Sequence, residues 1–155
     1  IAFRAAAQPE LIARMRAEGH RVGLHCHEHA RHSLRSAAWG RQDAAHALTQ
    51  LAGVGVKPTL WRTPWGDTAG WTKPLAREHG LTLVPWTVDT HDWRGDSAET
   101  MFQSTVGGLR SGAIVLAHDG VGPGALRAHA RETIEYTSRV IAHAQAEKLE
   151  LEAVA

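Results

Sequence analysis

The chain has 155 residues and a formal net charge of only +1, with 17 Lys plus Arg against 16 Asp plus Glu. This balance argues against a surface that binds nucleic acid or membrane through bulk charge. The length predicts a single domain with a real core, and the lone Cys26 excludes a disulfide framework and a cysteine-only zinc site. No stretch approaches the roughly 18 consecutive apolar residues that a membrane span needs.

Helical patterns occur in five segments, which are residues 9–18, 41–52, 68–79, 97–109 and 125–147. Pro9 suits the first position of a helix, and Gly19 is a typical end for that helix. Ser97, with Glu99 in the first turn, is a start signal for the fourth segment. Residues 26–39 show no clear period, so we expect a loop there.

Strand patterns alternate with these helices, at residues 21–25, 59–61, 81–88, 113–117 and 149–154. Pro85 interrupts the third of them. A helix before each strand predicts an α/β fold, with a parallel sheet or barrel and right-handed crossovers. In such folds the chemistry lies where the carboxyl ends of the strands meet.

Titratable and aromatic side chains follow four of these strands in succession, which is the pattern of a barrel active site. The first strand leads to a histidine pair, the second to an Arg and a Trp, the third to two Asp and a Trp, and the fourth to a His. The candidate site residues are His25, His29, Arg62, Trp65, Asp89, Asp92, Trp93, Leu116 and His118.

His25 and His29 are four residues apart, and a helical turn would place both rings on one face, able to share a metal ion. A histidine-rich surface loop explains the same spacing equally well. We expect His27 and His32 to face solvent or to support the pair.

His118 ends an apolar strand, where it is either a core histidine or a general acid that titrates near neutrality. Arg62 is either a surface residue in a turn or a fixed guanidinium that orients a catalytic carboxylate. Asp89 and Asp92 either cap turns or hold His118 in its working tautomer.

The tryptophans divide into two groups by their surroundings. Core packing is expected for Trp86, which lies within a strand pattern. Trp65 and Trp93 lie in turn-rich loops and better suit the wall of a ligand site, where flat rings meet the C–H surface of a sugar or an acyl group.

These motifs resemble the NodB-homology domain of polysaccharide deacetylases, carbohydrate esterase family 4. The family's His-Ser/Thr-x-x-His motif matches HCHEH at 25–29, although Cys26 takes the Ser/Thr place. Its Arg-x-Pro-aromatic motif matches RTPW at 62–65, with Trp65 where Tyr or Phe is usual. Its Asp-x-x-Asp-Trp motif matches DTHDW at 89–93, and its Leu-x-His motif matches LAH at 116–118.

The resemblance implies a distorted (β/α) barrel in which residues 1–155 form the catalytic domain without its first strands. The family's first motif, Thr-Phe-Asp-Asp, would lie upstream of Ile1; it supplies the base Asp and the Asp metal ligand. We therefore expect the isolated chain to lack activity and to expose unpaired strand edges.

The resemblance also implies a metal-dependent hydrolase of C–N bonds that removes N-acetyl or O-acetyl groups from an amino-sugar polymer such as chitin or peptidoglycan. His25 and His29 would hold a divalent metal, usually zinc, and Arg62 would orient the base.

In the same family pattern, His118 would protonate the leaving amine, tuned by Asp92 or Asp89. Trp93 and Leu116 would line the acetyl pocket, and the backbone N–H of Trp65 would stabilise the oxyanion. Two other interpretations remain open: a small-molecule amidase for ureides or cyclic imides on the same scaffold, and an inactive fragment. The family suggests a secreted or cell-envelope location.

Overall fold

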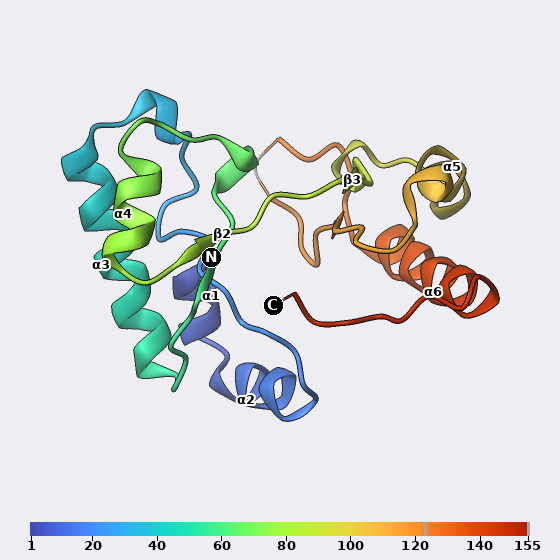
Figure 1. Cartoon of the computed structure of the whole chain (residues 1–155), viewed down its shortest axis with the longest axis horizontal. Coiled ribbons are helices and arrows are strands. Elements are labelled where there is room, and N and C mark those ends of the chain that lie inside the picture. Colours follow the sequence, from blue (N-terminus) through green and yellow to red (C-terminus); the bar gives the residue numbers. More distant parts are fainter. Residues whose placement is uncertain (123, 155) are drawn as a thin grey trace. The chain divides into compact units, whose positions relative to one another are not determined.

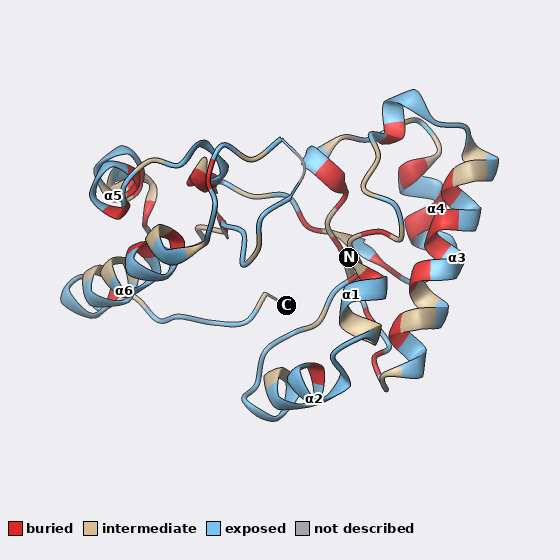
Figure 2. Ribbon diagram, turned by 180° about the vertical axis from the view of Figure 1, so that it is seen from behind, coloured by how far each residue is buried: buried red, intermediate tan, exposed pale blue. Residues whose placement is uncertain are grey.

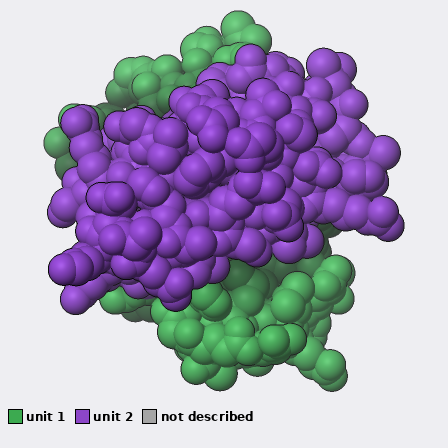
Figure 3. All heavy atoms as spheres, turned by 90° about the vertical axis from the view of Figure 1, so that its right-hand side faces the viewer, with its two compact units in different colours: residues 1–85 green, residues 86–155 purple. Residues whose placement is uncertain are grey.

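The computed structural model describes residues 1–122 and 124–154, which form two compact units, residues 1–85 and 86–155 (Figures 1 and 3). Each unit combines helices with a pair of short parallel strands. No helix among the described residues is long and apolar enough to cross a membrane. A single domain over residues 1–155 stays a prediction.

The first unit contains four α-helices, two short strands and two 3-10 turns. In chain order these are α1 (Ala2–Ala6), α2 (Pro9–Ala17), η1 (His32–Leu34), α3 (Ala37–Gly53), β1 (Leu60–Trp61), η2 (Pro64–Gly66), α4 (Thr72–Glu78) and β2 (Thr82–Leu83).

Three segments of the first unit run parallel and position the first two motifs. β1 pairs with β2 in the register Leu60 to Thr82, and Leu24 forms an isolated parallel bridge to Trp61. Because His25 directly follows Leu24 and Arg62 directly follows Trp61, this pairing places the starts of both motifs side by side.

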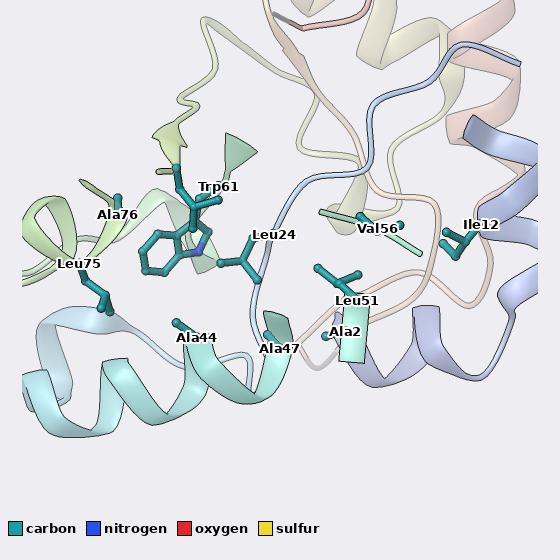
Figure 4. Close-up of a cluster of buried hydrophobic side chains, with 11 residues drawn as sticks. Ala2, Ile12, Leu24, Ala44, Ala47, Leu51, Val56, Trp61, Leu75 and Ala76 are labelled. Carbon is teal, nitrogen blue, oxygen red and sulfur yellow. The ribbon is translucent and has the colours of Figure 1, made fainter. Parts of the chain in front are cut away.

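The core of the first unit lies between these segments and the helices. Figure 4 shows Trp61 and Leu24 beside the buried alanines of α3, Ala44 and Ala47. One side of α3 is buried and the other is exposed, as its helical spacing requires (Figure 2). Trp61 is 2% exposed, and its indole N–H donates to the carbonyl of His25 at 3.0 Å, so the core is tied directly to the histidine loop.

The described part of the second unit, residues 86–122 and 124–154, contains two α-helices, two short strands and two 3-10 turns. In chain order these are β3 (Val88–Asp89), η3 (Asp92–Arg94), α5 (Ala98–Thr105), η4 (Val106–Gly108), β4 (Val115–Leu116) and α6 (Arg131–Ala146). β3 and β4 are parallel, with Val88 opposite Val115. α5 packs on α6 around Met101 and Tyr136, whose hydroxyl group shares a hydrogen bond with Thr105 at 3.0 Å.

Several predicted boundaries were wrong, each for an identifiable reason. The predicted strand 81–88 is two strands, β2 and β3, separated by a segment that contains Pro85, which has no N–H for a ladder. The predicted strand 21–25 is reduced to the bridge at Leu24. The predicted strand 149–154 has no regular structure and pairs with no strand in the described part of the chain, and Leu151 is 62% exposed.

The helices also differ from their predicted ranges. α1 has no counterpart in the prediction, and α3 begins within the predicted loop because Ser36 caps it by accepting the N–H of Trp39. α6 begins at Arg131, six residues later than predicted. The preceding segment is held in another conformation, with the N–H of Leu126 donating to the carbonyl of Trp93.

Candidate active site

His25 and His29 lie together, with ring centroids 5.1 Å apart. The Nδ1–H of His25 donates to the carbonyl of Arg62 at 2.6 Å, which leaves Nε2 as the nitrogen with a lone pair. Burial lowers the pKa of His25 to about 4, so the ring is neutral at pH 7, the form that binds metals. The expected adjacency of the two rings is therefore present.

The expected helical turn under this pair is absent: residues 27 and 28 form a bend, and residues 25, 26 and 29 have no regular structure. Two amides of this loop are bound from α3 instead: Asp43 accepts the N–H of His27 at 3.1 Å and that of Glu28 at 2.6 Å. Asp43 is 6% exposed, so this buried carboxylate holds the backbone of His27 and Glu28 in place.

Two ligands alone do not complete a metal centre. Among residues 1–122 and 124–154, no group of three or more His, Cys, Asp or Glu side chains could hold an ion. Cys26 lies between the two histidines, but it is 2% exposed and burial raises the pKa of its thiol to about 12. Its side chain packs as a small apolar group and is not a thiolate ligand.

Arg62 carries a buried polar atom with no partner in the described part of the chain. Its Nε is inaccessible to solvent and makes no hydrogen bond. Burial also lowers the pKa of the guanidinium. A buried unsatisfied donor is costly, and a carboxylate is its natural acceptor.

Trp65 lies in a strained turn and is 48% exposed. Its φ of 55° is in the left-handed region, which a bulky residue rarely adopts, and strain of this kind gathers at functional sites. The ring of His29 meets it edge-on, with centroids 4.2 Å apart. The guanidinium of Arg31 lies 4.8 Å from the ring centroid.

An open pocket of about 430 Å³ adjoins this turn. It is lined by His29, Ala30, Arg31, Leu34, Arg35 and Trp65. The volume is in the range of small-ligand sites. One of its walls is therefore the histidine of the candidate metal pair, and another is an exposed aromatic ring.

In the second unit, Asp92 holds His118 by two hydrogen bonds. The ring Nδ1–H donates to Oδ1 at 2.7 Å, and the backbone N–H of His118 donates to Oδ2 at 2.8 Å. The hydrogen bond to Asp92 raises the pKa of His118, and this effect outweighs burial. Burial alone would raise the pKa of Asp92, but the hydrogen bonds from His118 and Thr133 lower it to about 2.

Asp89 has a different environment, because its carboxylate accepts the N–H of His91 at 2.9 Å and the indole N–H of Trp86 at 3.2 Å. Among the hydrogen bonds of the described residues, Asp92 and not Asp89 binds the His118 ring. Leu116 is 9% exposed in β4, while Trp93 is 40% exposed.

Two other expectations were wrong, the core packing of Trp86 and the solvent-facing position of His32. Trp86 is only partly buried, because its indole N–H turns to Asp89 rather than into the core. His32 is 1% exposed; its ring stacks on Trp71 at 4.6 Å and shares a hydrogen bond with Thr72 at 3.1 Å. The remaining spare histidine, His27, is half-buried and donates to Gln50.

Sequence reasoning missed three residues that hold these side chains in place: Asp43, Arg127 and Thr133. Their signals were weak, because an Asp within a helix pattern and an Arg or Thr near a helix start are common on surfaces. Arg127, at 9% exposed, donates to Asp92 at 3.0 Å, and Thr133 donates to the same carboxylate oxygen at 2.9 Å.

Comparison with known proteins identifies the family of the chain. The family described as polysaccharide deacetylase matches residues 1–84. A chitooligosaccharide deacetylase of Bradyrhizobium is 36% identical over 124 residues, which is 77% of this chain and 55% of that protein. The peptidoglycan-N-acetylglucosamine deacetylase PgdA of Listeria monocytogenes is 35% identical over 116 residues, which is 72% of this chain and 23% of that protein.

A solved structure shows the fold over nearly the whole chain. A family 4 carbohydrate esterase of Streptomyces lividans, in complex with acetate, superposes with a TM-score of 0.80 at 27% identity, over 94% of this chain and 71% of that one. The fold is therefore the (β/α)-barrel type of the NodB-homology domain. The chain belongs to the polysaccharide deacetylase family, and it spans about half or less of the two curated relatives described above.

Proposed function

We propose that this chain is the core of a hydrolase that removes N-acetyl, or O-acetyl, groups from an amino-sugar polysaccharide such as chitin or peptidoglycan. The observation that carries the proposal is the Asp92–His118 pair, a buried carboxylate that raises the pKa of an exposed imidazole. The two curated relatives act on acetylated amino sugars, by their names, and this supports the substrate class.

His118 is the proposed general acid. Asp92 occupies Nδ1, so Nε2 is the nitrogen that gives its proton to the leaving amine. The raised pKa keeps more of the imidazole protonated near neutral pH, as an acid requires. In the family pattern Asp89 would add negative charge nearby, and it lies among the groups that raise the pKa of His118.

His25 and His29 are the proposed metal ligands. The fit is supported by the neutral His25 ring, whose Nδ1–H is taken by a backbone carbonyl, an arrangement usual for metal-bound histidine. When bound, a divalent ion such as zinc would polarise the acetyl carbonyl and lower the pKa of a water molecule. A further ligand is needed, which we assign to the Asp of the family's Thr-Phe-Asp-Asp motif, a motif that the 155 residues do not contain.

Arg62 and Trp65 are assigned to orientation and charge stabilisation. The unpartnered Nε of Arg62 would donate to the carboxylate that acts as general base. The backbone N–H of Trp65, in its left-handed turn, would donate to the oxyanion of the tetrahedral intermediate. The exposed ring of Trp65 would contact the sugar, and Trp93 and Leu116 would line the pocket for the acetyl methyl group.

The direct test measures acetate release from chitooligosaccharide and from peptidoglycan fragments, with zinc and with EDTA. We expect His118→Gln to lower kcat by about 10²- to 10⁴-fold without loss of bound metal, and His25→Gln to lower metal content. His20→Gln, at an exposed position, is the matched control. Release that neither EDTA nor His118→Gln affects contradicts the proposal, and hydrolysis confined to a small cyclic imide favours the amidase alternative.

A further inference from the structure

Arg127 is a buried cation that contacts both the side chain and the main chain of the proposed acid pair. Its Nη1 donates to Asp92 Oδ2 at 3.0 Å. Its Nη2 donates to the carbonyl of His118 at 2.8 Å and to that of Gly120 at 2.9 Å. One guanidinium therefore connects the carboxylate under the imidazole with the backbone that carries the imidazole.

Thr133, near the start of α6, completes this cluster. Its hydroxyl group accepts from Arg127 Nη1 and donates to Asp92 Oδ2 at 2.9 Å. The two oxygens of Asp92 thus have separate partners: Oδ1 receives the His118 ring, while Oδ2 receives the buried donors and the His118 amide. Because the other donors bind Oδ2, Oδ1 stays available for the His118 ring.

Removal of the Arg127 charge would make it less favourable for Asp92 to stay ionised beside His118. Asp92 is 1% exposed, so its negative charge depends on paired cations and hydrogen bonds to remain ionised. Arg127 supplies a positive charge fixed in place by four acceptors, and its planar fork reaches them at once, which a lysine ammonium does not do.

We propose that Arg127 is a positioning residue for the deacetylase reaction, which holds both Asp92 and the His118 backbone in the geometry for proton donation. The kinetic part of this inference rests on the proposed function. The structural part concerns only the charges around His118.

Three charged groups act on the His118 ring in the second unit. Asp92 and Asp89 raise its pKa, burial lowers it, and Arg127 also lowers it. Loss of the Arg127 charge should therefore raise the pKa of His118 further. A residue that only supports the packing of the unit would not produce this directional change.

The experiment titrates His118 by NMR in the 155-residue chain, with its signal assigned from His118→Gln. Acetate release is measured in a longer protein that contains this chain and also supplies the missing carboxylate ligand. Arg127→Met keeps the apolar stem and removes the charge. We expect the titration midpoint of His118 to rise and kcat to fall on the order of 100-fold. Arg127→Lys should restore the midpoint but not kcat, because the charge returns without the fork.

The control is Arg139→Met on α6, which removes a surface partner of Glu99 by the same change of side chain. An unchanged midpoint in a folded Arg127→Met chain, or an equal change in Arg139→Met, overturns the proposal. If Arg127→Met does not fold, parental turnover in Arg127→Lys overturns it. If the longer protein without any substitution releases no acetate, the proposed function fails, while the titration of the 155-residue chain still decides the role of Arg127.

Discussion

Replacing Asp92 by Asn is expected to destabilise the second unit far more than its small change in shape suggests. The Asp92 side chain has no exposed surface, and it forms an ion pair with Arg127, whose own side chain is 5% exposed. Asparagine would leave that cation buried without a counter-charge. Breaking one side of a buried pair in this way costs about 3–5 kcal/mol.

The lowered pKa of Asp92 gives a free energy of the same order. The pKa of Asp92 is lowered from 3.8 to about 2 in the folded chain. A difference of this size corresponds to about 2 kcal/mol in favour of the folded carboxylate. Because the folded pKa is depressed, this stabilisation is present above pH 3.8 and is lost as the pH falls through about 2. Asp92→Asn should lack this acid dependence.

The contribution of His118 to stability depends on pH in the opposite direction. The pKa of His118 is raised above 6.5, so its contribution to stability is complete below pH 6.5 and is lost as the pH rises through the folded pKa. The pair should therefore stabilise the unit most between pH 3.8 and 6.5. His118→Gln should remove the decline on the alkaline side, and it should also weaken the decline on the acid side, because the His118 side chain helps to lower the pKa of Asp92.

The assay is urea unfolding at pH 6, followed by far-UV circular dichroism, with repeats at lower pH. Asp89→Asn is the matched control, because this carboxylate is partly exposed, caps a local turn and pairs with no arginine among the described residues. We expect it to lose about 1 kcal/mol or less. If Asp92→Asn loses no more than Asp89→Asn, the ion pair with Arg127 does not hold this unit together.

Three further outcomes are expected. Gly40→Ala should destabilise the chain by about 1–3 kcal/mol in urea unfolding, because a Cβ there would lie 2.2 Å from the Trp71 ring, whereas Gly53→Ala, with nothing within 4 Å in the same helix, should be neutral or stabilising. Asp43→Asn should lower the free energy of unfolding by about 1–3 kcal/mol, because it weakens two hydrogen bonds to the histidine loop. A loss below about 0.5 kcal/mol would show that Asp43 does not hold this loop in place. Cys26 should react with a thiol reagent at pH 8 only after unfolding, because burial raises its pKa to about 12.

The sequence was most informative where the relevant contacts follow from short spacings. The i, i+4 spacing identified His25 and His29 as neighbours, and the rings do lie together, although a bend rather than a helical turn brings this about. The carboxylate beside the acid was left open between Asp89 and Asp92. The hydrogen bonds select Asp92, which no local pattern could have done.

Elements whose structure depends on distant partners were predicted least well. The alternating Leu and Glu of residues 149–154 satisfy a strand pattern, but a strand also requires a neighbour with free backbone groups. By contrast, the start of α3 could have been predicted from a local signal, the capping residue Ser36. The start of α6 was not, because residues before Arg131 follow contacts made by Leu126 and Arg127 rather than their helical propensity.

The cluster around Asp92 resolves a conflict between exposure and precision in the proposed acid. The His118 side chain is 47% exposed, as an acid that meets a polymer must be, yet an exposed side chain is ordinarily free to rotate. A buried carboxylate that binds both its ring and its amide restrains it, but that carboxylate then needs a buried cation of its own. Arg127 comes from 35 residues further along the chain and meets this need at Asp92. A change at Asp92 therefore leaves the Arg127 charge buried without a counter-charge, whereas a change at Arg127 leaves Asp92 with the half-exposed His118 as its cationic partner.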